Sequence, residues 1–252
     1  GNLVSNSRSD DSGVSARVYK SGVYGFASAA EYSDDSIKAV LDAAKENALF
    51  MDSRVRKNKP ALPSIGTGSF SLTRDVKDVE QKTYIEFAKE VDAYIASKYP
   101  SLASRTVVVR ADSMEKLLVV SDGYNSHSLM PRSFVYVFMT AQAKDGGTVE
   151  IYNPYGGYGY FNEVFTSPQS LFPRIDSLYD ELMKKAEGVF NDAGYKDVVM
   201  HPDLAGILAH EAVGHTVEAD LVLGGSVAAH NLGKKVASEL VSMVDFAHSA
   251  FG

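Results

Sequence analysis

Cysteine is absent from this chain of 252 residues. The absence excludes disulfides, thiolate metal ligands and catalysis by a cysteine nucleophile within the chain. Any metal ion that these residues bind must therefore be held by histidine, aspartate or glutamate side chains.

Long apolar runs and an excess of positive charge are also lacking. No stretch approaches the roughly 20 apolar residues that cross a bilayer, and the first five residues are too polar for a secretory signal. The 25 Lys and Arg are outnumbered by 32 Asp and Glu, which gives a net charge of -7. Because phosphate backbones are bound by clustered Lys and Arg, we expect a cytoplasmic protein with no nucleic-acid or membrane partner.

Apolar residues recur at helical spacing in three stretches. The first begins near Ser33, the second spans residues 79–98 and the third runs from about 168 to 191. The buried stripe of the first helix is predicted to be Ile37, Val40, Leu41, Ala44 and Ala48. That of the third is predicted to be Ile175, Leu178, Leu182, Ala186 and Val189.

Residues rich in Val, Phe, Tyr and Thr predict strands between these helices. A hairpin is expected from Val14–Tyr19 and Val23–Ala27 around Ser21-Gly22, and residues 52–73, with their prolines and glycines, predict a connecting loop. Further strands are expected at residues 105–111, 116–121, 133–141, 147–152 and 197–200.

The order of these elements predicts an α+β fold with a mixed, largely antiparallel sheet packed with helices. We expect an α+β domain over residues 1–195. Residues 196–252 are expected to add a strand, a metal-binding helix and the start of a further region.

Glycine and tyrosine crowd the segment from residue 152 to residue 161. The glycines permit unusual backbone angles and the tyrosines offer flat amphipathic surface. Two interpretations stay open. The segment is either a substrate-binding loop that uses Tyr155, Gly157 and Tyr158, or a crossover between two elements.

The chemistry of the chain concentrates in the run HEAVGH at residues 210–215. In HExxH zinc peptidases, two histidines four residues apart lie about 40° apart around a helix and reach one metal ion. Here the spacing is five, which on a regular helix separates the imidazoles by roughly 140°. Gly214 tolerates the kink, bulge or early helix end that would bring His215 back.

We expect His210 and His215 to bind a divalent metal ion, preferably zinc, and Glu211 to act as general base. A catalytic zinc normally has three protein ligands. Glu218 and Asp220 could ligate, could orient a ligating imidazole or could serve the helix structurally; the last two roles are preferred. A structural alternative also stays open, in which the histidines are buried and bond backbone carbonyls. The remaining histidines, predicted to lie at the surface or in loops, are His127, His201, His230 and His248.

Residues 210–220, HEAVGHTVEAD, resemble the metal motif of the TldD/PmbA family of metalloproteases, some of which are named modulators of DNA gyrase. The agreement extends to residues 202–206 upstream and 236–240 downstream. It reaches, more weakly, residues 13–17 and 25–28.

The resemblance implies a peptidase in which the two motif histidines hold zinc or iron and the motif glutamate is catalytic. It implies that a cysteine from a C-terminal half completes the site. It also implies a dimer, either of two copies or with a PmbA/TldE-like subunit, enclosing a groove for peptide substrates. Since both histidines and the glutamate are kept, the chain resembles the active TldD type.

Two features depart from the family pattern. The chain stops soon after the motif without a cysteine, and it begins with Gly1 inside the family's N-terminal region. We therefore expect the N-terminal part of a longer protein, or a short relative. The first hypothesis is a TldD-type peptidase or the metal-binding half of its site, and the alternative is a catalytically incomplete peptide-binding or assembly module.

Overall fold

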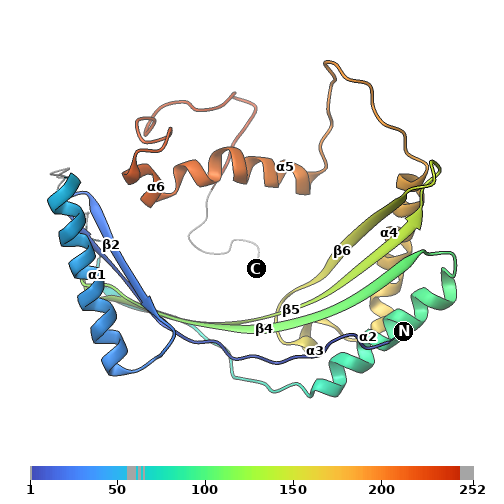
Figure 1. The fold of residues 1–252 in the computed structure, drawn as a ribbon, viewed down its shortest axis with the longest axis horizontal. Coiled ribbons are helices and arrows are strands. Elements are labelled where there is room, and N and C mark those ends of the chain that lie inside the picture. The colour runs from blue at the N-terminus through green and yellow to red at the C-terminus, as the bar shows by residue number, and fades with distance from the viewer. Residues whose placement is uncertain (1, 56–60, 62–63, 65, 245–252) are drawn as a thin grey trace. The chain divides into compact units, whose positions relative to one another are not determined.

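The computed structural model describes residues 2–55, 61, 64 and 66–244 (Figure 1). The chain forms two compact units, one from residues 1–5 and 65–193 and the other from residues 6–64 and 194–252. Residues 6–64 thus group with the C-terminal segment instead of with the rest of the first 195 residues. Among the described residues, no helix combines the length and the apolar character needed to span a membrane.

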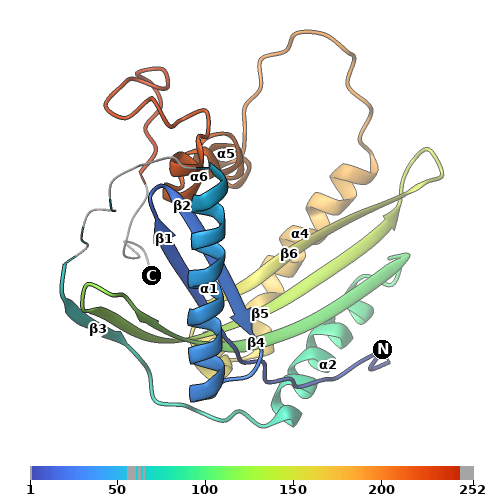
Figure 2. The same cartoon turned by 60° about the vertical axis from the view of Figure 1, so that its left-hand side comes forward.

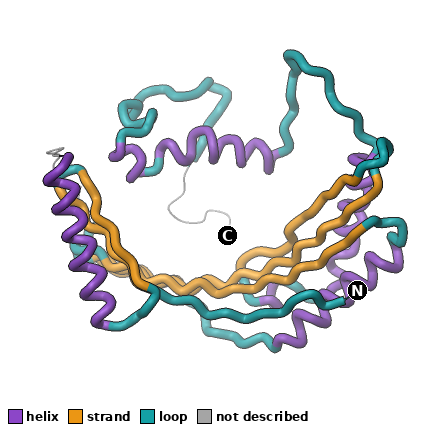
Figure 3. Tube along the Cα trace, in the orientation of Figure 1, coloured by secondary structure: helices purple, strands orange, loops and turns teal. Residues whose placement is uncertain are grey.

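The first unit is built on a four-stranded sheet. Its strands are β3 (Gly68–Leu72), β4 (Ser104–Val119), β5 (Tyr124–Gln142) and β6 (Thr148–Tyr158). β5 is central, because it pairs antiparallel with β4 and β6 and parallel with β3. The long strands run side by side in Figure 3. The predicted α+β fold with a mixed, largely antiparallel sheet is confirmed.

Alternation along β5 gives the sheet two different faces. Odd-numbered residues from Leu129 to Ala141 are buried, and the even-numbered residues between them are only partly buried. Because successive side chains of a strand point to opposite faces, the odd-numbered set forms the core side.

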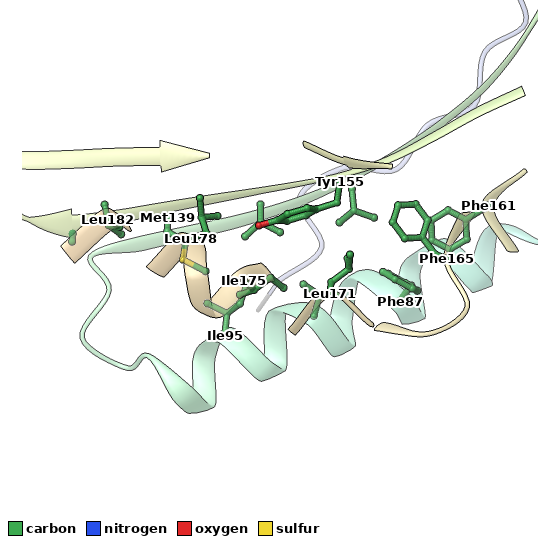
Figure 4. Packing of buried hydrophobic residues seen from close by; sticks show 14 residues of the cluster. Phe87, Ile95, Met139, Tyr155, Phe161, Phe165, Leu171, Ile175, Leu178 and Leu182 are labelled. Carbon is green, nitrogen blue, oxygen red and sulfur yellow. The ribbon is translucent and has the colours of Figure 1, made fainter. Parts of the chain in front are cut away.

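Helices cover the core side of this sheet. They are α2 (Gln81–Lys98), α3 (Phe161–Val164), the 3-10 turn η1 (Pro168–Leu171) and α4 (Phe172–Ala186). α2 and α4 carry apolar residues at helical spacing on the face toward the strands. The core cluster, much of which is labelled in Figure 4, consists of Phe87, Val91, Ile95, Val135, Val137, Met139, Ala141, Tyr155, Phe161, Phe165, Leu171, Ile175, Leu178 and Leu182.

One carboxylate connects α2 to α4. Asp176 of α4 accepts hydrogen bonds from Tyr94 Oη at 2.6 Å, Tyr99 Oη at 2.5 Å and Lys98 Nζ at 2.7 Å. Burial acts to raise the pKa of Asp176, but the hydrogen bonds from Lys98 and the two tyrosines outweigh it and lower that pKa. The ionised carboxylate is therefore the form that stabilises the helix pair.

The second unit contains a hairpin packed on a long helix, as Figure 2 shows. β1 (Val14–Lys20) and β2 (Val23–Ala29) pair antiparallel, and α1 spans Asp34–Val55. The turn residues Ser21 and Gly22 have φ angles of 49° and 100°, as a two-residue type I′ turn requires. The predicted hairpin is confirmed.

α1 and β2 approach one another at the level of their backbones. A side chain on Gly25 would place its Cβ 2.0 Å from the carbonyl oxygen of Ala44 and 2.2 Å from the amide nitrogen of Ala48. Val40, Ala44 and Ala48 are buried on this face of α1. Small residues on both sides therefore allow the hairpin to lie directly on the helix.

The C-terminal part of the second unit is a run of short helices. α5 (Pro202–Ala209) leads into the π-helical turn η2 (His210–Gly214), the 3-10 turn η3 (His215–Val217) and α6 (Ala219–Gly224). Pro202 occupies the first turn of α5, and His201 Nδ1 accepts the amide of Asp203 at 3.4 Å. The helix predicted to carry the motif is present.

Several predicted boundaries are wrong. The loop predicted over residues 52–73 holds the end of α1 and strand β3 instead. The two strands predicted at 105–111 and 116–121 are one strand, β4, because polar Asp112 pairs across the ladder with Arg132 Nε at 2.9 Å. The strand predicted at residues 197–200 is absent, and Val199 there is fully exposed without a partner strand.

The helix predicted to reach residue 191 ends at Ala186. Beyond it, the amide of Gly188 donates to the carbonyl of Lys185 at 3.0 Å in a tight three-residue turn that leaves the α-helical pattern, and the carbonyl of Ala186 accepts the amide of Lys144 at 3.1 Å. Val189, predicted to be buried, is 92% exposed as a result. On α1, Leu41 is also exposed, because it lies at the edge of the buried stripe.

The glycine- and tyrosine-rich segment is not a loop up to Tyr158, because it continues β6. Gly156, with a φ of 145°, lies so close to β5 that an added Cβ would fall 2.0 Å from the carbonyl oxygen of Ser133. Tyr155 is buried in the core, and its hydroxyl donates to the carbonyl of Arg174 at 3.2 Å. Its ring is therefore closed to a substrate.

We expect Gly25→Ala to destabilise the protein by about 1–3 kcal/mol, because the new methyl group overlaps the backbone of α1. Gly206→Ala is the matched control, since a Cβ on this helical glycine meets nothing within 4 Å and alanine favours the helix. Urea denaturation followed by circular dichroism measures both. Equal stability of the two variants would contradict the backbone contact.

Asp176→Asn is expected to lower stability at pH 7 by about 1–3 kcal/mol, because three donors lose a charged acceptor. The pKa of Asp176 is lowered from 3.8 in the folded state, so its contribution is present above that value and is lost as the pH falls through the folded pKa. The difference from wild type should therefore shrink below about pH 4. Asp180→Asn, one turn further along α4, is the control, and a pH-independent difference for Asp176→Asn would refute the assignment.

Candidate metal centre

A single π-helical turn brings the two motif histidines together. The amide of His215 donates to the carbonyl of His210, five residues earlier, so the turn closes after five residues instead of four. The two imidazole rings consequently meet edge to face, with centroids 4.4 Å apart and an interplanar angle of 69°. The bulge expected from the five-residue spacing is present.

Gly214 forms this bulge with ordinary helical angles, φ -52° and ψ -56°. A Cβ on Gly214 would lie 3.7 Å from His210 Nδ1, which is an ordinary van der Waals contact. The glycine is thus not required for a left-handed conformation. Its lack of a side chain leaves space beside the His210 ring.

His210, Glu211 and His215 can each offer one ligand atom, and these atoms lie within 4.8 Å of one another. Glu211 Oε2 lies 3.7 Å from His215 Nε2. Ligands of one zinc ion lie about 2.0–2.2 Å from it, so small rotations of these exposed side chains bring the set within range. Two imidazoles and a carboxylate suit zinc, and also fit other first-row divalent ions.

Glu218 binds the far side of the second imidazole. Its Oε1 lies 2.5 Å from Nδ1 of His215. This contact raises the pKa of His215, against a smaller lowering by burial. In the tautomer in which Nδ1 donates to Glu218, Nε2, which lies 3.7 Å from Glu211 Oε2, carries the lone pair that can bind a metal ion. Glu218 is therefore within hydrogen-bond distance of the His215 ring at Nδ1.

Asp220 takes part in a different contact. Its Oδ2 accepts a hydrogen bond from Nη1 of Arg17 at 3.3 Å, and its Oδ1 accepts the amide of Leu221 at 3.0 Å. Arg17 lies on β1, with its guanidinium 5.7 Å from the ring centroid of Tyr24. Sequence reasoning missed Arg17, although it belongs to the segment 13–17 that carries part of the family resemblance.

A shallow open pocket adjoins His215. It is lined by Thr216, Leu221, Gly224, Gly225 and Ser226. Ser226 connects two sides of the pocket. The hydroxyl of Ser226 donates to the carbonyl of Thr216 at 2.6 Å, and the amide of Ser226 donates to the carbonyl of Leu221 at 3.0 Å. Gly225, with a φ of 99°, ends α6 in the left-handed conformation that glycine favours.

The other predicted site residues lie in different surroundings. Gly157 and the exposed Tyr158 are part of β6 in the first unit. His201 and His230 are exposed as predicted, whereas His127 is in β5 instead of a loop, 2.8 Å from Glu115 Oε1. His248 lies outside the described residues. The structural alternative of buried motif histidines is wrong, because both are exposed.

Two domain models of one family match the ends of the chain. The PmbA/TldA metallopeptidase domain 1 matches residues 1–48, and the PmbA/TldA metallopeptidase C-terminal domain matches residues 193–252. The second match contains the whole motif, and the first contains Arg17.

Curated relatives extend the similarity over most of the chain. A metalloprotease of Methanothermobacter thermautotrophicus is 29% identical over 93% of this chain and 50% of its own length. A zinc metalloprotease TldD homolog of Saccharolobus solfataricus is 25% identical over 93% of this chain and 50% of its own length. The chain therefore spans about half the length of the curated relatives it matches.

A solved structure shares the fold. The chain matches 51% of a candidate modulator of DNA gyrase from Bacteroides thetaiotaomicron with a TM-score of 0.58, at 16% identity and over 90% of this chain. Domain models, curated relatives and fold agree with the motif geometry. The chain belongs to the PmbA/TldD family of metallopeptidases.

Proposed function

We propose that this chain carries the metal-binding part of a peptidase active site of the TldD type. The observation that carries the proposal is the π turn, because it brings His210, Glu211 and His215 into one exposed group. A chance surface cluster would not need a rare helical form to assemble it. Several relatives are named metalloproteases, which supports the same activity.

His210 and His215 would hold a divalent ion, preferably zinc, with iron as the second choice. A bound ion supplies Lewis acidity that polarises the substrate carbonyl. Glu211 holds a water molecule, accepts its proton as the oxygen attacks the carbonyl carbon, and returns the proton to the leaving amine nitrogen. Glu218 keeps His215 in the tautomer and orientation that this arrangement requires.

A catalytic zinc normally has three protein ligands and one open position. If Glu211 is the base, the described group supplies two ligands. We propose that the third comes from outside these residues, as the family resemblance implies for a cysteine of the C-terminal half. Peptide substrates and a second subunit, either a copy or a PmbA/TldE-like chain, belong to the same proposal.

The incomplete ligand set also favours one alternative, a peptide-binding or assembly module without turnover. The two functions differ in a simple assay. If the chain binds zinc and unstructured peptides but cleaves none of them, the alternative holds, and metal-dependent cleavage would eliminate it.

In the protein completed by the proposed third ligand, Glu211→Gln is expected to retain zinc within about tenfold of wild type and to lose about 100-fold to 10,000-fold in peptide hydrolysis, because it removes a base and keeps both imidazoles. Zinc is measured by competition with a chromophoric chelator, and hydrolysis by mass spectrometry of a peptide mixture. Glu239→Gln is the control for an exposed glutamate. Unchanged hydrolysis in Glu211→Gln would refute the role of Glu211.

Deletion of Ala212 is expected to keep zinc affinity within about tenfold, because it restores the four-residue spacing and an ordinary α-helical turn places both imidazoles on one face. Insertion of one alanine after Ala212 should abolish binding, since a six-residue spacing separates the two imidazoles by roughly 120° around a regular helix. The chelator competition assay measures both. Loss of zinc in the single deletion would show that the π turn does more than bring the rings together.

A further inference from the structure

The geometry points to Arg17 as a positioning residue of the metal centre. Through Asp220 it holds the turn that keeps Glu218 against His215. The inference rests on the proposed function, because it concerns the imidazole that would hold the metal. It assigns to the N-terminal hairpin a part in a site whose ligands lie about 200 residues later in the chain.

Arg17 lies in the paired part of the hairpin. It lies within β1, paired with Phe26 of β2, and the hairpin rests on α1 through the backbone contact at Gly25. The guanidinium also lies 5.7 Å from the centre of the Tyr24 ring, within the range of a cation–π interaction. The guanidinium of Arg17 is therefore held by a paired strand and lies beside the ring of Tyr24.

Asp220 connects the hairpin β1–β2 to α6. One of its carboxylate oxygens accepts the amide of Leu221 in the first turn of α6, and the other accepts Arg17 Nη1 at 3.3 Å. Because both oxygens are engaged, the position of the first turn of α6 is coupled to that of β1.

Glu218 lies immediately before that turn. Its backbone leaves the helical conformation, with φ -56° and ψ 135°, and its carbonyl accepts the amide of Val222 at 2.8 Å. Its side chain contacts His215 Nδ1 at 2.5 Å. A shift of the first turn of α6 therefore moves the residue that orients the imidazole.

The expected effect is modest. The side chains of Arg17 and Asp220 are 55% and 44% exposed, and exposed ion pairs contribute little to global stability. Loss of a group that orients a ligating histidine typically weakens metal binding about 10-fold to 100-fold. As Arg17 acts through one further residue, we expect a loss of about 3-fold to 10-fold in zinc affinity with an unchanged urea midpoint.

The test compares Arg17→Gln, Arg17→Lys, Asp220→Asn and the exchanged pair Arg17→Asp with Asp220→Arg. Lys235→Gln is the matched control, because Lys235 forms an exposed ion pair with Glu239 at 2.9 Å in the same unit and removing it makes the same charge change. Zinc affinity is measured by chelator competition. The Nδ1–H proton of His215, which the contact with Glu218 is expected to protect from exchange, is observed by NMR of the metal-free chain after ¹⁵N-histidine labelling.

Arg17→Gln and Asp220→Asn should weaken zinc binding and broaden the His215 proton signal. Arg17→Lys and the exchanged pair should restore both in part, and Lys235→Gln should change neither. If Arg17→Gln behaves like Lys235→Gln in both measurements, or if the exchanged pair restores nothing, the positioning role is wrong. If wild type binds no zinc, the proposed function fails, and the His215 signal of the metal-free variants still decides the role of Arg17.

Discussion

One backbone hydrogen bond, from the amide of His215 to the carbonyl of His210, determines what the motif can do. In a regular helix the same sequence would direct the two imidazoles to different sides of the helix. The wider π turn takes up the additional residue, and the rings meet at 4.4 Å with Glu211 beside them. Since π turns are rare and often occur at functional sites, the local backbone itself favours a metal centre here.

Two acidic residues that follow this turn, Glu218 and Asp220, bind different partners. Glu218 faces an imidazole, and Asp220, two residues later, faces a guanidinium. Their separation is possible because Glu218 leaves the helical conformation between η3 and α6, which directs the two carboxylates to different partners. In one continuous helix the relative directions of these two side chains would be fixed, so they could not be oriented toward the two partners independently.

The predictions that held are those with local causes. The hairpin, α2 and the bulge at residues 210–215 each follow from short-range spacing, turn chemistry or capping. The predictions that failed depend on distant partners. The polar interruption at Asp112 ends no strand, because Arg132 lies across the ladder and donates a hydrogen bond to its carboxylate. Likewise, no local pattern could indicate that Arg17 meets Asp220, 203 residues away.

The solvent exposure of the proposed metal centre limits the catalysis that these residues can provide alone. His210, Glu211 and His215 are all exposed, and in open water both general-base catalysis and charge stabilisation lose much of their strength. An ion held here would gain from a cover that excludes solvent and adds a ligand. The chain spans about half the length of the curated relatives it matches. Such a cover would accompany the third ligand that we propose from outside the described residues. The π turn and its supporting carboxylates would then act as the preformed part of a site that is completed by assembly.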